Sequence, residues 1–433
     1  MRQYGKKYFL LWSLCLLSAY LAGCSSLKST GQSTELQEET ELLSEQIVGT
    51  EDLEGSAETS EIQEASAEVS KIPEKSRDKI FQDKAAEYLD EMTIEEKAAQ
   101  LFIVLPESLM EDVGSVTEAG PVTREAIWEI PVGGFIYMEP NLESPEQVRS
   151  LLENVQKFSR ERTGLPMFLC VDEEGSAVAR IAGSGKFDVP VFEDMAKTGK
   201  RQNAKEAYEI GAAIGGYLSD LGFNVDFAPV ADVWTNPENQ VVKRRAFGSD
   251  ADVVSDLANA AAEGLQSQGI MACLKHFPGH GNTSSDTHAG YAYTDKTKEE
   301  LFQCELIPFA EGIEREIPFI MAGHISLPHI TGDDTPASLS PVIMTDLLRK
   351  EMGYDGIIIT DAFNMGAVVK QYSSGEAAVK SLTAGADMIL MPEDFMAAYN
   401  EVILAMKDGR LSAERVDASL MRILKRKLEW MEE

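Results

Sequence analysis

Eight short apolar runs recur along this 433-residue chain from residue 101 onward, and they constrain its fold more than any other feature. Each has four to ten residues, and successive runs start about 41 residues apart. Short runs that are apolar on both faces are typical of parallel strands buried between helices. The runs are 101–105, 132–138, 167–171, 224–233, 270–276, 319–325, 356–361 and 388–391.

Helical patterns separate these runs. Residues 202–221 and 250–268 carry apolar side chains at helical spacing, and 345–351 and 375–384 repeat this on a smaller scale. Eight alternations of strand and helix predict an α/β fold, a single (β/α)8 or TIM barrel. A doubly wound sheet is the alternative, but no GxGxxG or Walker-type phosphate loop follows any run.

Residues 1–23 have the features of a secretory signal. Arg2, Lys6 and Lys7 precede an apolar run at 8–22, which is shorter than the about 20 residues of a spanning helix. The run ends in LAGC, similar to a bacterial lipobox, in which the Cys is lipid-modified. We therefore expect an exported protein, lipid-anchored through Cys24 to the outer face of the cell membrane. A plain signal peptide or an uncleaved anchor is the alternative.

Composition defines the next segment. Residues 25–77 contain no Phe, Trp or Tyr, and they carry 13 acidic against 4 basic residues. Such a segment cannot bury enough apolar surface to fold. We expect 24–77 to be the lipidated Cys with a disordered acidic linker, and 78–433 to be one catalytic barrel domain. The net charge of −33 argues against nucleic-acid partners.

Polar residues stand at the ends of several apolar runs. Asp172, Lys275, His276 and Asp361 lie at or just after the ends of runs three, five and seven. The carboxyl ends of barrel strands form the active-site face of this fold. We therefore expect these side chains to meet in one site. For Asp232 and His324, at the ends of runs four and six, pocket lining and a structural role stay equally open.

The five histidines all fall within residues 276–329, and three lie in the stretch KHFPGHGNTSSDTHAG. A zinc site formed by His276, His280, Asp286 and His288 is one interpretation. Loop histidines satisfied by the backbone are another. Acid–base catalysis is the third, because Asp286 lies two residues before His288 and a carboxylate orients an imidazole. We expect His280 to shape the loop and His329 to be peripheral.

Four motifs in order resemble those of the β-N-acetylhexosaminidases of glycoside hydrolase family 3. KHFPGHG followed by DTH is similar to that family's signature, and the resemblance extends from about residue 85 to 430. The other segments are VDEEGSAVARI, RRAFG and GIIITDAFNMGA. The departures are Glu173, Ser176, Ala177 and Asn282, and they leave the preference for the leaving group open.

The resemblance implies a role for each matching residue. Asp361 would be the nucleophile that forms a covalent glycosyl-enzyme, and His288 the general acid/base with Asp286 as its partner. A retaining glycosidase needs such a carboxylate and a proton donor on opposite sides of the bond. The residues implied to bind sugar are Asp172, Arg180, Arg245, Lys275 and His276, with Arg244 competing for the place of Arg245.

The implied activity is an exo-acting β-N-acetylhexosaminidase that needs no metal or organic cofactor. Its substrate would be a glycan with terminal β-linked N-acetylglucosamine, from peptidoglycan fragments or chitooligosaccharides. Glucosidase-type members carry a second domain that supplies an acid/base carboxylate, and because the chain ends at Glu433 we expect the His288 loop to replace it. A phosphorylase with the same residues and a catalytically inactive glycan-binding lipoprotein are the alternatives. The oligomeric state does not follow from the sequence.

Overall fold

The computed structural model describes residues 74–110, 113–285 and 290–432. The predicted signal, Cys24 and nearly all of the predicted linker lie outside these residues. None of the described helices is both long and apolar enough to cross a membrane. The first described helix begins at Glu74, so that 74–77, which we assigned to the linker, are helical.

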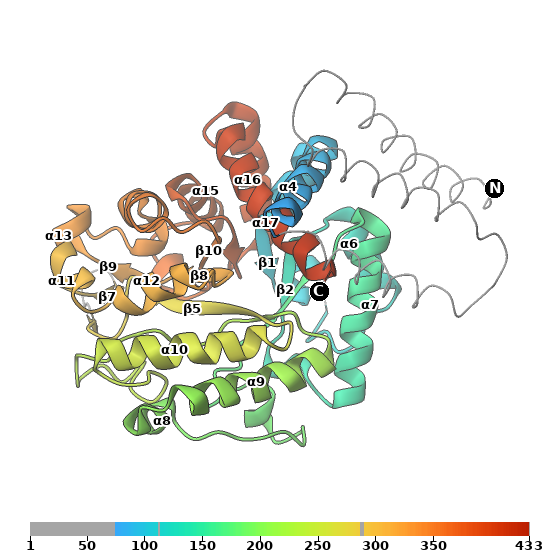
Figure 1. The fold of residues 1–433 in the computed structure, drawn as a ribbon. Coiled ribbons are helices and arrows are strands. Elements are labelled where there is room, and N and C mark those ends of the chain that lie inside the picture. Colours follow the sequence, from blue (N-terminus) through green and yellow to red (C-terminus); the bar gives the residue numbers. More distant parts are fainter. Residues whose placement is uncertain (1–73, 111–112, 286–289, 433) are drawn as a thin grey trace, which may run out of the picture. The chain divides into compact units, whose positions relative to one another are not determined.

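Eight parallel strands form the predicted barrel, one in each of the eight apolar runs (Figure 1). Each strand pairs with its neighbours in chain order, and β1 also pairs with the last strand. A bridge between Ile359 and Met388 closes the ring. The predicted TIM barrel is therefore confirmed. The strands are β1 (Phe102–Val104), β2 (Gly134–Ile136), β3 (Phe168–Val171), β4 (Val225–Asp226), β5 (Met271–Phe277), β8 (Phe319–Ala322), β10 (Ile357–Thr360) and β11 (Ile389–Leu390).

Helices surround this ring (Figure 1). The four predicted helical stretches correspond to α9, α10, a π-helix (η5) and α15, with ends that differ by up to three residues. The larger helices are α4 (Glu74–Glu91), α5 (Ile94–Gln100), α6 (Pro121–Glu129), α7 (Pro145–Thr163), α8 (Met195–Arg201), α9 (Ala204–Leu221), α10 (Ala251–Gln266), α12 (Ile307–Glu314), η5 (Val342–Glu351), α15 (Ser374–Ala384), α16 (Phe395–Asp408) and α17 (Ala413–Glu432). Shorter ones are η1 (Pro106–Leu109), η2 (Glu139–Asn141), η3 (Ala182–Ser184), α11 (Lys298–Phe302), α13 (Pro328–Thr331), η4 (Ala337–Leu339) and α14 (Gly366–Val369).

Side-chain caps and glycines explain how α9 and α10 form and pack. The Asn203 and Asp250 side chains accept hydrogen bonds from the first-turn N–H groups of the two helices. A Cβ on Gly211 would lie 2.0 Å from the Ala261 carbonyl oxygen, and one on Gly264 would lie 2.2 Å from that of Tyr208. Only glycine at these two positions lets the helices approach so closely. The result is the tight pair along one flank of the barrel (Figure 1).

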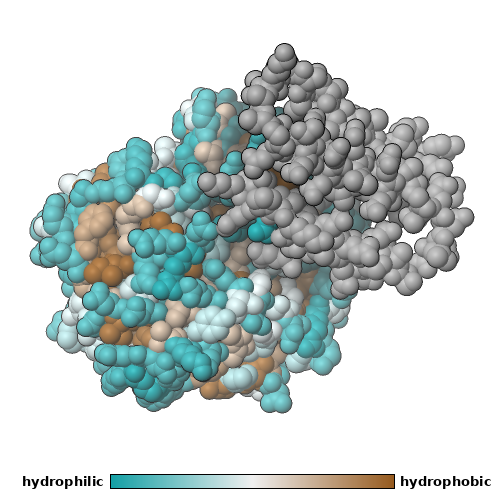
Figure 2. Space-filling model, in the orientation of Figure 1, coloured by the Kyte–Doolittle hydropathy of each residue, from teal (hydrophilic) through white to brown (hydrophobic). Residues whose placement is uncertain are grey.

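The surface matches the acidic, polar composition. On the face shown in Figure 2, hydrophilic residues predominate among those described, and hydrophobic residues form scattered small groups. Apolar side chains instead fill the barrel and the layer between strands and helices. Cys170 and Cys273 belong to this core as free thiols.

The amino ends of the strands are closed by α17. Lys427 of this helix is buried, and its Nζ donates to Gln100 Oε1 at 2.8 Å. The ammonium also lies 5.0 Å from the ring centre of Phe168, the first residue of β3. Burial lowers the pKa of Lys427 to about 7. Lys427 is thus packed beneath β3 at this end, whereas the predicted site residues follow the strands at the opposite end.

Asp387 reinforces the barrel where β10 and β11 meet. Its carboxylate is fully buried and accepts hydrogen bonds from Ser419 Oγ at 2.6 Å and Ile358 N at 2.9 Å. It also forms ion pairs with Arg349, Arg415 and Arg422. Burial opposes ionisation, but the three arginines hold the pKa of Asp387 below its usual range. One carboxylate thus joins η5 and α17 to both strands.

We predict that Asp387→Asn destabilises the fold strongly. The change leaves three buried or half-buried arginines without their anion, which costs about 3–5 kcal/mol in comparable buried pairs. The free energy of unfolding from urea denaturation measures the loss. Asp355→Asn is the matched control, because Asp355 pairs with Arg422 at 2.9 Å while its side chain is 87% exposed. Its loss should stay below about 1 kcal/mol. Equal losses in both variants would refute the special role of Asp387.

Candidate active site

The residues that follow β3 fold back on themselves. Glu174 N donates to Val178 O at 2.8 Å, and Arg180 N donates to Asp172 O at 3.3 Å. This return places the Arg180 guanidinium beside Asp172, with Nη2 3.9 Å from Oδ2. The buried Nε of Arg180 has no hydrogen-bond partner among the described residues. The turn therefore brings Arg180 and Asp172 together at the end of β3.

A buried ion-pair network joins this loop to β5. Lys275 Nζ lies 2.9 Å from Asp172 Oδ1 and 2.8 Å from Glu174 Oε1. Arg245 grips the Glu174 carboxylate with two hydrogen bonds of 2.7 Å, from Nε and Nη2. The Lys275 and Glu174 side chains are only 3% and 1% exposed. Pairing is what makes their burial tolerable.

The charges of this network shift its pKa values in opposite directions. Burial opposes ionisation of Glu174, but Lys275 and Arg245 overcome it and lower the pKa of Glu174 to about 2. Burial also favours neutral Lys275, but Asp172 and Glu174 hold the pKa of Lys275 well above its ordinary value. Lys275 is therefore an ammonium at any physiological pH, able to donate to a ligand.

The two neighbouring arginines of the RRAFG motif have different environments. Arg245 lies in the network, with its side chain 14% exposed. Arg244 points away to Asp194, with Nη2–Oδ1 2.8 Å and its side chain 65% exposed. The structure thus brings Arg245, not Arg244, to the predicted site.

The Asp232 carboxylate accepts hydrogen bonds from the loop that carries His276 and His280. Its Oδ1 accepts from the backbone N of His276 at 3.1 Å and of His280 at 2.6 Å. Its Oδ2 lies 2.8 Å from His276 Nδ1. A carboxylate only accepts here, so Nδ1 carries the proton, and Nε2 accepts from Arg245 Nη2 at 3.4 Å. Asp232 therefore fixes both the loop and the imidazole orientation of His276.

Asp361 follows β10 at the same end of the barrel. Its N donates to Ala322 O at 2.9 Å, and its Oδ1 accepts from Ala362 N at 2.8 Å. Burial opposes ionisation of Asp361, but the hydrogen bond from the Ala362 N–H and the nearby Lys275 ammonium favour the carboxylate, and the pKa of Asp361 lies below its usual range. Asp361 is therefore a carboxylate at neutral pH, beside Lys275 and His276.

Asp286 and His288 lie outside the described residues, but the segments on either side of 286–289 are described. Strand β6 (Ser284–Ser285) pairs antiparallel with β7 (Ala292–Tyr293), which pairs with β9 (Ile325–Ser326). Strand β9 comes directly after β8, whose last residue accepts from Asp361 N. The described strands that flank 286–289 are thus held at the end of the barrel that carries Asp361.

The remaining histidines have local partners. His280 Nδ1 lies 2.9 Å from Thr283 Oγ1 in its own loop. His329 is exposed, and its Nδ1 donates to Asp295 O at 2.7 Å. His324 is buried between Ser338 Oγ, at 2.7 Å, and Ala362 O, at 3.0 Å. No group of three or more His, Cys, Asp or Glu within the described part of the chain could hold a metal ion. The zinc alternative involves Asp286 and His288, so this finding does not test it.

Glu174 is the site residue that the sequence interpretation missed. In the sequence it appears only as one residue of the VDEEGSAVARI motif, but in the structure it is the partner of both Lys275 and Arg245. The signal was available, because a Lys at the end of a buried strand needs a carboxylate within reach. Asp232, left open between pocket and structure, positions His276 and belongs to the support of the site.

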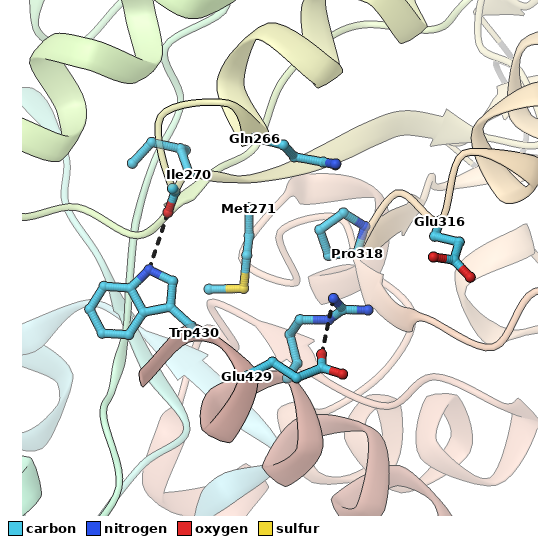
Figure 3. A pocket seen from close by; sticks show the side chains of 9 residues that line it. Gln266, Ile270, Met271, Glu316, Pro318, Glu429 and Trp430 are labelled. Carbon is cyan, nitrogen blue, oxygen red and sulfur yellow. Dashed lines mark hydrogen bonds and ion pairs between the residues drawn. The ribbon is translucent and has the colours of Figure 1, made fainter. Parts of the chain in front are cut away.

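A separate pocket lies at the opposite end of the barrel (Figure 3). Its walls include Ile270 and Met271 at the start of β5, Pro318 just before β8, and Trp430 of α17. The Trp430 indole N–H donates to Gly269 O at 3.1 Å, and Arg426 pairs with Glu429 at 3.1 Å (Figure 3). This pocket lies at the end of the barrel away from Asp361 and holds none of the predicted site residues.

Comparisons with known proteins agree with this geometry. Residues 93–426 match the profile of the glycosyl hydrolase family 3 N terminal domain. The chain belongs to glycosyl hydrolase family 3, as the sequence motifs predicted.

Individual relatives carry more specific names. Beta-hexosaminidase A of Pseudoalteromonas piscicida is 33% identical over 337 residues, which are 72% of this chain and 56% of that protein. Beta-hexosaminidase LpqI of Mycobacterium tuberculosis is 34% identical over 60% of this chain and 67% of its own. The structure of a family 3 β-N-acetylglucosaminidase from Paenibacillus has a TM-score of 0.72 and 36% identity, covering 78% of this chain and 63% of that one. The chain thus spans just over half the length of the first of these relatives.

We predict that Glu174→Gln destabilises the protein by about 3 kcal/mol at pH 7, because Lys275 and Arg245 lose their shared anion. The folded-state pKa of Glu174 is about 2, against an ordinary value of 4.5. Its contribution is therefore present above pH 4.5 and is lost as the pH falls toward 2. Urea denaturation at several pH values measures the unfolding free energy of both proteins. The difference between wild type and variant should become smaller below pH 4.5.

Glu173→Gln is the matched control for this experiment. Burial raises the pKa of Glu173, so acidification should not erase the stability difference between this variant and wild type. If the difference in unfolding free energy between Glu174→Gln and wild type stays constant with pH, then Glu174 is not the shared anion of Lys275 and Arg245.

Proposed function

We propose that this protein is an exo-acting, retaining β-N-acetylhexosaminidase. The observation that carries the proposal is Asp361, an ionised carboxylate at the barrel mouth beside Lys275 and His276. One of its oxygens, Oδ1, is held by Ala362 N, and no hydrogen bond within the described residues occupies Oδ2. The names of the family relatives, beta-hexosaminidase and β-N-acetylglucosaminidase, support the choice of an N-acetylated amino sugar.

In the first step, Asp361 Oδ2 attacks the anomeric carbon and forms an ester bond to the sugar. The bond to the leaving group breaks, and His288, in its imidazolium form, gives its proton to the departing oxygen. In the second step, the now neutral His288 takes a proton from water, whose oxygen attacks the same carbon and releases Asp361. Asp286 would accept from the other imidazole nitrogen and favour the charged form in the first step.

Sugar recognition falls to the charge network. Lys275, Arg180 and Arg245 offer N–H donors to hydroxyl or acetamido oxygens, and Asp172 accepts from hydroxyl groups. Since Lys275 and Arg245 are already held by Glu174, their donors are pre-oriented and lose little entropy on binding. His276 presents a fixed imidazole to the same space.

The sequence motifs and the LAGC segment support a proposal for the substrate and the location. We propose terminal β-linked N-acetylglucosamine on peptidoglycan fragments or chitooligosaccharides, reached by an exported enzyme that is lipid-anchored through Cys24. An acidic linker of about 50 residues would have a span of about 40 Å, enough to hold the barrel clear of the membrane surface. No metal or organic cofactor enters the proposed steps.

We expect Asp361→Asn to abolish turnover, because a neutral amide is a poor nucleophile toward the anomeric carbon. His288→Ala should slow substrates with poor leaving groups at least about 100-fold, and activated 4-nitrophenyl glycosides much less, because only the former need a proton. Steady-state rates on 4-nitrophenyl N-acetyl-β-glucosaminide and on chitobiose measure both. Arg244→Ala is the control and should keep wild-type rates, since Arg244 faces Asp194 on the surface.

The outcomes of this assay separate the alternatives. Equal losses for both leaving-group classes would remove His288 as the acid. Turnover that depends strongly on added phosphate and yields sugar 1-phosphate would replace hydrolysis by phosphorolysis. Saturable sugar binding without turnover in the wild type would replace the enzyme by a binding lipoprotein.

The anchoring proposal predicts that the wild-type chain, expressed in a bacterium, incorporates labelled palmitate and sediments with membranes. Cys24→Ser should lose the label and leave the membrane fraction, because the acyl chains would no longer tether it. Fractionation with an antibody to the barrel measures the distribution. An unlabelled wild type, or a variant that still sediments, would contradict lipidation at Cys24.

A further inference from the structure

His324 connects two groups at the carboxyl end of the barrel. It lies two residues after β8 and is buried, with its side chain between η4 and the turn after β10. Its Nε2 is 3.0 Å from Ala362 O, and its Nδ1 is 2.7 Å from Ser338 Oγ. A carbonyl oxygen can only accept, so Nε2 carries a proton and donates to Ala362.

The imidazole is held in its neutral form. Burial lowers the pKa of His324, and the opposing effect of the Asp361 charge does not cancel this. The Ala362 carbonyl thus selects the tautomer with the proton on Nε2, and Nδ1 then accepts from the Ser338 hydroxyl. Among the described residues, the ionisable groups that act on this ring are Asp361 of the β10 end and His276 of β5.

The residue whose carbonyl His324 holds also hydrogen-bonds Asp361 through its N–H. The Ala362 N–H donates to Asp361 Oδ1 at 2.8 Å, while the carbonyl of the same residue accepts from His324. The flanking groups are fixed as well, because Asp361 N donates to Ala322 O and Phe363 N donates to Leu390 O, each at 2.9 Å. The turn is thus clamped between β8 and β11, and His324 clamps it at the residue next to Asp361.

We propose that His324 is a positioning residue for Asp361. By fixing the Ala362 carbonyl, it restrains the backbone at Ala362, whose N–H holds Asp361 Oδ1 and leaves Oδ2 for the substrate. The inference rests on the proposed function, because it takes Asp361 as the nucleophile. It goes beyond that function by giving His324 a definite part in the reaction, although His324 itself touches no reacting atom.

A hydrogen-bonding role and a packing role predict different results. The His324 ring also lies 5.6 Å from the ring of Phe363, so its removal disturbs packing in any case. Lost packing lowers the melting temperature but has no reason to change the ionisation of Asp361. A lost hydrogen bond to Ala362 O frees the backbone at Ala362, weakens the hydrogen bond from the Ala362 N–H to Asp361 Oδ1 and raises the pKa of that carboxylate.

The test compares His324→Leu, which removes the Nε2 donor and the Nδ1 acceptor at similar volume, with His324→Gln, whose amide can still donate to Ala362 O. For each, kcat, KM and the pH profile of kcat/KM are measured on 4-nitrophenyl N-acetyl-β-glucosaminide, with the melting temperature alongside. We expect His324→Leu to lower kcat about 100-fold with little change in KM. The acid limb of its kcat/KM profile should move to higher pH by about one unit, which is the effect of a lost hydrogen bond to a charged group. His324→Gln should recover at least about tenfold in kcat.

Phe363→Leu serves as the packing control, and we expect it to lower the melting temperature without moving the acid limb. If His324→Leu does not fold, Ser338→Ala takes its place, with a smaller kcat loss and a limb shift in the same direction. Either of two results would overturn the proposal. One is an acid limb of kcat/KM that does not move in His324→Leu, or in Ser338→Ala where it takes the place of that variant. The other is a kcat of His324→Gln as low as that of His324→Leu. Failure of the proposed function is visible separately, as a wild type without turnover or an active Asp361→Asn.

Discussion

The buried pair of Lys275 and Glu174 is the interaction on which the site depends. An ammonium that is 3% exposed is tolerable only beside a fixed anion, and Glu174 supplies it at 2.8 Å. Glu174 also holds Arg245, and Lys275 also holds Asp172. The pair therefore joins strand β5 to two loops, the one after β3 and the one after β4. The groups proposed to bind sugar are therefore positioned by one another before any ligand arrives.

The two ends of the barrel divide stability and chemistry between them. At the amino end, Asp387 gathers three arginines and Lys427 fills the space under β3. These groups satisfy one another and offer little to a ligand. At the carboxyl end, Arg180 keeps a donor that the described residues do not satisfy, and Asp361 keeps one oxygen free of them. That contrast is expected for a TIM barrel, whose strand ends serve stability on one side and reaction on the other.

The sequence predicted the barrel well because buried parallel strands must be apolar on both faces, and all eight such runs became strands. It placed Asp172, Lys275, His276 and Asp361 together because the carboxyl ends of parallel strands share one face. It could not choose between Arg244 and Arg245, since neighbouring residues differ only in the partners that folding brings near. The roles of Glu174 and His324 depend on partners 71 and 38 positions away, which no local pattern encodes. Asp286 and His288 remain predictions from sequence.

The central claim is that Asp361 forms a covalent bond with the sugar. The most direct measurement is peptide mapping by mass spectrometry after reaction with a 5-fluoro N-acetyl-β-glucosaminide carrying a good leaving group, which slows release of the intermediate. The account predicts one added sugar per chain, on the peptide that contains residues 356–367, with fragmentation placing it on Asp361. A label on another carboxylate, or rapid turnover of this reagent with inversion at the anomeric carbon and no label, would contradict it.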